Sequence, residues 1–128
     1  MPRTLAVRAA RAAAEHLGRD IRVLQVRELI AITDYFVLVS GGTDRHVHAV
    51  GDAIEDELRD AGVKPLRREG ERENRWLLLD FADIVVHVFH EEERAYYELE
   101  RLWKDAPEIA WEPAKRAPST ASAKRAPV

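Results

Sequence analysis

The chain has no cysteine among its 128 residues, which excludes disulfide bonds and thiolate metal sites. It also lacks a long apolar segment, since runs such as FVLV and IVVHVF are far shorter than the roughly 20 residues of a membrane-spanning helix. The Ala-rich N-terminus is interrupted by Arg8 and Arg11, so it has no unbroken apolar stretch of signal-peptide length. We therefore expect a soluble cytoplasmic protein.

Clustered positive charge is also scarce. The formal net charge is -3, with 16 Lys and Arg against 21 Asp and Glu over residues 1–107, and four basic against two acidic residues over 108–128. A surface that binds phosphates in general needs grouped cations, so the acidic body gives no support to specific nucleic-acid binding. It is a better match for a basic protein partner.

What the chain does contain predicts an α/β fold, with helices packed on a small mixed β-sheet. Apolar spacing predicts helices over 4–17, from a cap at Thr43 or Asp44 to Gly62, and over 91–104, and strands over 21–26, 35–40, 64–69, 75–81 and 84–89. Pro65 suggests that its strand lies at an edge. The length is that of one domain, expected over 1–107. Residues 108–128, rich in Pro, Ala, Ser and basic residues, are expected to form a flexible tail because they cannot bury a core.

The stretch WLLLDFADIVVHVFH, residues 76–90, places polar groups within the most apolar part of the chain. Asp80 and Asp83 flank a tight turn, where paired carboxylates could bind Mg²⁺, perform acid–base chemistry, cap the turn or contact a partner. Strand alternation puts Trp76 and Leu78 on the same face as Asp80. This mixture suits a protein–protein interface, and the alternative is that Trp76 belongs to the core.

Two further patterns resemble phosphate or metal sites. The SGGTD segment at 40–44 joins a strand to a helix and could hold a phosphate or form a plain turn, but the Walker lysine, the G-x-G-x-x-G spacing and a following D-x-D pair are missing. His46 and His48 diverge on a helix, and His87 and His90 fall on opposite faces of a straight strand. No nucleophilic motif is present either. We expect no enzyme activity and no metal.

Three segments in order resemble the ribosomal silencing factor (RsfS, or Iojap-like) family over about residues 3–107. They are TDYFVLVSGGTDRHVHAVGDAIEDEL, the Glu69-Gly70 pair, and WLLLDFADIVVHVFHEEERAYYELERLWKDAP. The resemblance implies a homodimeric α/β protein, similar in topology to nucleotidyltransferases but without their catalytic acids. It further implies a cofactor-free translational repressor that binds ribosomal protein fourteen of the large subunit and sterically blocks joining of the small subunit when nutrients are scarce.

The positions that match the family motifs are the candidate partner-binding residues: Trp76, Leu78, Asp80, Asp83, His87, Phe89, Glu93, Arg94 and Tyr97. Among them, Phe89 could serve the fold alone. Asp34 and Tyr35 also match, and we expect them to serve the fold or the dimer. The family usually has glycine where this chain has Ala82, and a turn with φ above zero would cost alanine about 1 kcal/mol.

Two other functions stay open at this point. One is a large-subunit assembly factor that uses the same surface, and the other is a nucleotide-using transferase, for which the sequence supplies neither acid pair nor phosphate loop. The basic tail over 108–128 could touch ribosomal RNA or remain solvated.

Overall fold

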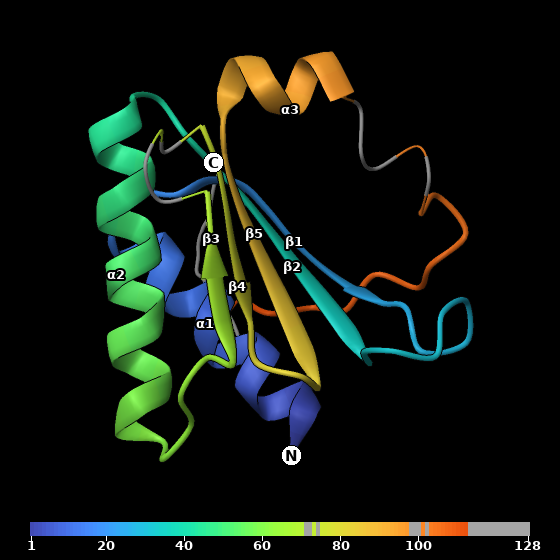
Figure 1. The fold of residues 1–128 in the computed structure, drawn as a ribbon. Coiled ribbons are helices and arrows are strands. Elements are labelled where there is room, and N and C mark those ends of the chain that lie inside the picture. Colours follow the sequence, from blue (N-terminus) through green and yellow to red (C-terminus); the bar gives the residue numbers. More distant parts are fainter. Residues whose placement is uncertain (71–72, 74, 98–100, 102, 113–128) are drawn as a thin grey trace, which may run out of the picture.

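The computed structural model describes residues 1–70, 73, 75–97, 101 and 103–112. Its elements follow the predicted order of helices and strands (Figure 1). They are α1 (Pro2–Glu15), β1 (Arg19–Gln25), β2 (Tyr35–Gly41), α2 (Asp44–Asp60), β3 (Arg67–Glu69), β4 (Trp76–Asp80), β5 (Ile84–His90) and α3 (Glu91–Tyr97). The predicted α/β fold is thereby confirmed.

The five strands form one mixed sheet in the order β1-β2-β5-β4-β3. The two central strands, β2 and β5, run parallel, and every other pair is antiparallel. β3 is short and lies at the edge, as Pro65 in the segment before it indicates. Because β2 is buried along its whole length, the sheet is centred on an almost continuously apolar strand.

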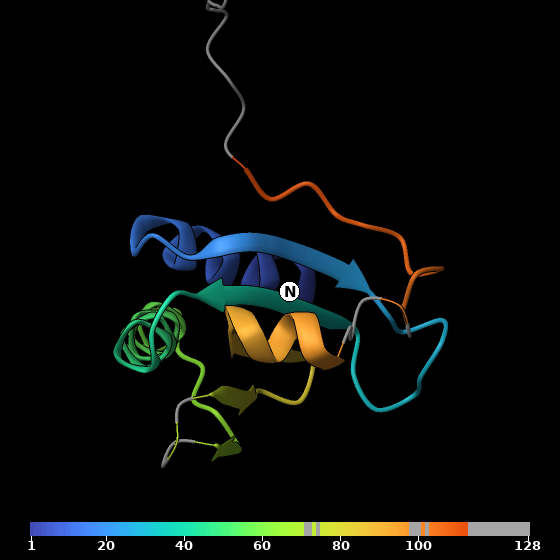
Figure 2. The ribbon, with the colours of Figure 1, turned by 90° about the horizontal axis from the view of Figure 1, so that it is seen from above.

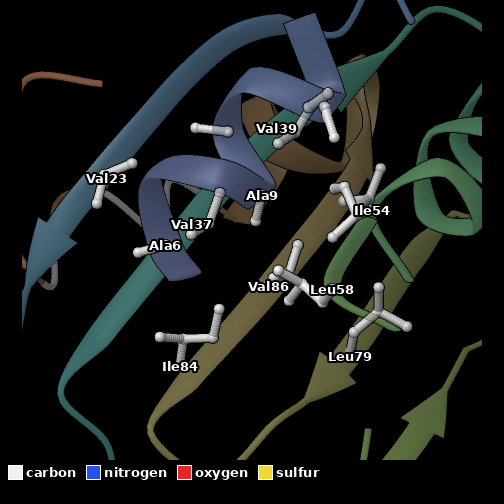
Figure 3. Packing of buried hydrophobic residues seen from close by; sticks show 14 of the residues in the cluster. Ala6, Ala9, Val23, Val37, Val39, Ile54, Leu58, Leu79, Ile84 and Val86 are labelled. Carbon is white, nitrogen blue, oxygen red and sulfur yellow. The ribbon is translucent and has the colours of Figure 1, made fainter. Parts of the chain in front are cut away.

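Helices α1 and α2 cover one face of the sheet (Figures 1 and 2). Alternate residues of β2, β4 and β5 point into this core, where they meet the two helices (Figure 3). The part of α1 that faces inward is almost entirely alanine, so the helix can lie close to the sheet and to α2. Buried members of this core include Ala6, Ala9, Ala13, Val37, Val39, Ile54, Leu58, Leu79, Val86 and Val88.

Local chemistry fixes how α2 begins and how closely it packs. Thr43 is its N-cap, and the hydroxyl accepts a hydrogen bond from the His46 amide at 3.0 Å, as predicted. At Gly51 an added Cβ would collide with the side chain of Leu77, so glycine permits the close approach of the helix to β4.

The first helix ends two residues before the prediction. Leu17 adopts φ +64° and is 77% exposed, and the Gly18 amide donates to the Ala13 carbonyl oxygen to close the helix. The helical spacing of apolar residues that predicts the helix over 4–17 is therefore wrong at Leu17, which lies outside the helix and is exposed. α3 is described as far as Tyr97, and residues 98–100 and 102 of the helix predicted over 91–104 lie outside the described residues.

The packed chain extends beyond residue 107, where the sequence places the end of the domain. The Gln25 amide donates to the Pro107 carbonyl oxygen, and the Ile109 amide donates to the Val23 carbonyl oxygen, both at 2.8 Å. Ile109 is buried in the helix-side core, and the Trp111 indole donates to the Ile21 carbonyl oxygen at 3.2 Å. The prediction of an unpacked tail from residue 108 therefore does not hold for 108–112, because two large apolar side chains anchor this segment along β1. Residues 113–128 lie outside the described part of the chain.

Candidate partner-binding surface

The sheet face opposite α1 and α2 carries a different set of side chains, which we call the aromatic face. It consists of the outward-pointing residues of β2, β4 and β5: Phe36, Leu38, Trp76, Leu78, Asp80, Val85, His87 and Phe89. The register places Trp76 opposite Phe89 and Leu78 opposite His87, as the predicted strand alternation requires. Trp76, Leu78 and Asp80 are half-buried, so this face is only partly covered by the described chain.

His87 occupies the centre of an aromatic group. Its ring centroid lies 4.8 Å from that of Phe36, 5.9 Å from that of Phe89 and 6.1 Å from that of Trp76. The Trp76 indole donates from Nε1 to Nδ1 of His87 at 3.1 Å. His87 is 7% exposed, and burial lowers the pKa of its imidazole to about 4, so the ring is neutral at physiological pH.

Phe89 and Arg94 are both buried. Phe89 has no exposed surface, and Arg94 is 7% exposed, donates to the Ser40 hydroxyl at 2.8 Å and lies over the Phe89 ring. These two side chains, like that of His87, are shielded from solvent and pack against other residues of the face. The family motif therefore mixes partly exposed residues with buried ones.

The turn between β4 and β5 holds the two aspartates at one end of the aromatic face. Asp80 accepts a hydrogen bond from the Ala82 amide at 2.9 Å and another from Arg67 at 3.3 Å, so it caps the turn and remains half-buried. Asp83 is exposed, and among the described residues no hydrogen bond or ion pair of its carboxylate is present. Ala82 has φ +73°, the left-handed conformation in which glycine is favoured.

The acidic start of α3 lies at the other end of these strands. Glu93 is half-buried and accepts a hydrogen bond from Arg75 at 3.3 Å, while Glu92 accepts one from the same guanidinium at 3.0 Å. The hydrogen bond from Arg75 lowers the pKa of Glu92 below its usual value. Tyr97 is the last residue of α3, and its side chain lies outside the described part of the structure.

The SGGTD segment between β2 and α2 forms hydrogen bonds within the protein. The Gly42 amide donates to Nδ1 of His46 at 3.1 Å, and the other ring nitrogen of His46 lies 2.9 Å from the His16 carbonyl oxygen. His46 thereby joins the end of α1 to the start of α2, and His48 instead faces Asp52 at 3.1 Å. Within the described ranges no group of three His, Asp or Glu side chains could hold a metal ion.

Sequence reasoning missed the loop between β1 and β2 as part of this surface. Ile32 is 84% exposed and Leu29 is 47% exposed, which is unusual for two large aliphatic side chains in one loop. The Asp34 amide donates to the Asp83 carbonyl oxygen at 2.9 Å, so this loop adjoins the β4–β5 turn. The apolar letters LIAI between two strands are the signal that could have revealed it.

None of the described helices is both long and apolar enough to cross a bilayer. Their apolar residues form stripes that pack on the sheet, as in α2.

Comparisons with known proteins agree with one another. Residues 2–127 match the family model described as "Ribosomal silencing factor during starvation". The Ribosomal silencing factor RsfS of Bacillus subtilis is 41% identical over 99 residues, which are 77% of this chain and 84% of that protein. A mouse protein named "Mitochondrial assembly of ribosomal large subunit protein 1" is 38% identical over 67% of this chain and 39% of its own length.

Solved structures give the same result for the fold. A crystal structure of a Chromobacterium violaceum protein superposes with a TM-score of 0.79 at 27% identity, covering 98% of this chain and 97% of that one. A Bacillus halodurans protein gives a TM-score of 0.70 at 33% identity, covering 84% and 94% of the two chains. The matched motifs, the mixed sheet and these relatives show that the chain belongs to the ribosomal silencing factor (RsfS, Iojap-like) family.

Proposed function

We propose that this chain is a translational repressor that binds the large ribosomal subunit through ribosomal protein fourteen of that subunit and sterically blocks joining of the small subunit. The observation that carries the proposal is the aromatic face, the sheet face opposite α1 and α2, on which Trp76 and Leu78 are half-buried. Aromatic and aliphatic anchors with a polar rim are the usual composition of a protein–protein interface.

Charge supports a ribosomal partner. The two aspartates of the β4–β5 turn lie beside this face, and over residues 1–107 acidic residues outnumber basic ones by 21 to 16. A ribosomal protein is commonly basic because it must neutralise RNA phosphates, and opposite surface charges favour encounter and orientation. The family's name also supports a regulatory protein rather than an enzyme.

The proposed contacts divide by burial. Trp76, Leu78, Asp80 and Asp83 would form the contact surface, and the exposed Ile32 extends it at the turn. The buried side chains of His87, Phe89 and Arg94 would position this surface. Glu93 would contribute negative charge at the α3 end, and Tyr97 remains a proposed contact on the family resemblance alone.

We further propose that the chain is a cytoplasmic homodimer in its free form. Sedimentation equilibrium of the purified chain tests the dimer, because a mass near 14.6 kDa would be the monomer and twice that mass the dimer. A single monomeric species at all accessible concentrations would reject the dimer without affecting the repressor proposal.

A second function, assembly of the large subunit, is favoured by the mouse relative's printed name. The two functions differ in what happens after binding. An occluding repressor prevents subunit joining on a finished large subunit, whereas an assembly factor leaves joining of finished subunits unaffected.

The first experiment is sedimentation of the purified chain with finished large ribosomal subunits, followed by addition of small subunits. Co-sedimentation with loss of joined ribosomes is the expected result. Co-sedimentation with normal joining would favour the assembly function. Absence of binding would reject both.

The surface assignment is tested by reversing the exposed carboxylate, Asp83→Lys, because this side chain makes no described polar contact whose loss would disturb the fold. We expect affinity for large subunits to fall at least tenfold, and this loss should be larger at low salt than at high salt. The free energy of unfolding should be unchanged. The control is Glu15→Lys, an exposed position on α1, on the opposite side of the sheet. Equal loss in both variants would indicate a general charge effect and reject the site.

A further inference from the structure

We propose that His87 is a positioning residue for the aromatic face: its Nδ1 atom holds the Trp76 indole in the orientation that the ribosomal partner meets. The inference rests on the proposed function for its link to binding, but the positioning role can be measured on the free protein. The carrying observation is the hydrogen bond from Trp76 Nε1 to His87 Nδ1 at 3.1 Å, between two residues 11 apart on adjacent strands.

The hydrogen bond determines the state of the ring. An indole nitrogen can only donate, so Nδ1 must be an unprotonated acceptor, and the single ring proton must reside on Nε2. Nε2 is buried and has no hydrogen-bond partner within the described residues. A doubly protonated imidazolium would lose the acceptor that Trp76 needs, and burial lowers the pKa of His87 to about 4, which keeps the ring neutral.

Packing makes the ring a rigid support. Phe36 contacts it edge-on at 4.8 Å between centroids, and Phe89 stacks against it at an interplanar angle of 13°. The contacts with Phe36 and Phe89 restrict the orientation of the imidazole. They therefore also restrict the direction from which Nδ1 can accept the Trp76 indole N–H. Trp76 also lies 5.0 Å from the Phe89 ring centroid, so the indole plane is limited by contact as well as by the hydrogen bond.

His87 has a property that a residue needed only for packing would not require. The buried Nε2–H group of His87 has no hydrogen-bond partner among the described residues, a cost that an apolar side chain would avoid, so filling the site does not by itself require histidine. What histidine adds is the acceptor for Trp76. A preordered indole loses less side-chain freedom when a partner binds, which raises affinity.

The test uses two substitutions of nearly equal shape, His87→Asn and His87→Leu. The asparagine side-chain oxygen can take the place of Nδ1 as an acceptor, and leucine cannot. The readout on the free protein is hydrogen exchange of the Trp76 indole N–H by NMR, assigned with Trp76→Phe. The second readout is affinity for purified bacterial large ribosomal subunits.

We expect His87→Leu to speed Trp76 indole exchange by at least tenfold and to weaken binding by about tenfold, while His87→Asn restores most of both. Equal indole exchange in the wild type and both variants would overturn the positioning role. Faster exchange with unchanged affinity would overturn its link to binding. If the wild-type chain does not bind large subunits, the proposed function fails, and the indole exchange still decides whether His87 positions Trp76.

Discussion

The two faces of the sheet are built from alternate residues of the same strands, yet they differ in chemistry. The helix-covered face is aliphatic, with Leu77, Leu79, Val86 and Val88 fully buried beneath α1 and α2. The aromatic face places three aromatic side chains and an imidazole beside carboxylates and leaves several half-buried. Both faces contain a cluster of buried apolar side chains, and the aromatic face adds an imidazole and side chains that stay partly exposed.

Two neighbouring leucines of β4 lie on opposite faces of the sheet. Leu79 is fully buried on the helix-covered face, and Leu78 is half-buried on the aromatic face. Identical substitutions at the two positions should therefore separate stability from binding.

The largest effect is expected for Leu79→Ala. Removing a fully buried leucine side chain loses apolar burial and leaves a cavity, which lowers the free energy of unfolding by about 2–5 kcal/mol. Urea unfolding followed by circular dichroism measures this loss. The folded fraction should still bind large subunits with wild-type affinity, and a loss of affinity would show that the two faces are not separable.

The next largest effect is a dependence of the free energy of unfolding on pH, which we expect from His87 on the aromatic face. The pKa of His87 is lowered from 6.5 to about 4 by burial, so the unfolded chain takes up a proton at higher pH than the folded chain does. This group's stabilisation is complete above pH 6.5 and is lost as the pH falls toward 4, by about 3 kcal/mol in total. Urea unfolding between pH 7 and pH 4 should show this loss in the wild type and lack it in His87→Leu. Parallel curves for the two proteins would contradict the burial of a neutral imidazole.

A smaller change in stability but a larger change in function is expected for Leu78→Ala. Since this side chain is half-buried, its loss should lower the free energy of unfolding by about 1 kcal/mol or less. Affinity for large subunits should fall by about tenfold if Leu78 is an interface anchor. The measurement is the same sedimentation assay, with Leu79→Ala as the matched control. Unchanged binding would remove Leu78 from the surface.

The smallest effect is expected at the turn that joins the two strands. Ala82 adopts φ +73°, which is strained for alanine, so Ala82→Gly should raise the free energy of unfolding by about 0.5–1 kcal/mol despite the greater freedom of glycine when unfolded. A thermal melt measures the gain. A lower melting temperature would indicate that the alanine methyl group makes a compensating contact.

Most of the fold could be predicted because its signals are local. The order of the elements, the Thr43 cap, the edge position of β3 and the face alternation of β4 all follow from neighbouring residues. The family motifs over residues 76–90 likewise fall on strands that the sequence predicts and the structure contains. What these signals share is that each depends on a few adjacent positions.

The rest depends on contacts between distant segments, which no local pattern encodes. Trp111 packs on β1 from 90 residues away, so composition alone made its segment look like a tail. The burial of His87 and Arg94 depends on rings and a hydroxyl contributed by other strands, namely Phe36, Trp76 and Ser40. A motif residue's type shows that it matters, but only the assembled sheet shows whether it lies on the surface or beneath it.

The segment that follows Pro107 has a consequence for how copies of this protein can associate. Its hydrogen bonds to β1 cover one edge of the sheet, so among the described strands only β3 has an outer edge without a described pairing. A sheet with two unpaired edge strands can pair with another copy at each edge and grow into a fibre. With one edge covered, association through strands ends after a single pairing, and a two-fold symmetric pair is the largest assembly that this route permits.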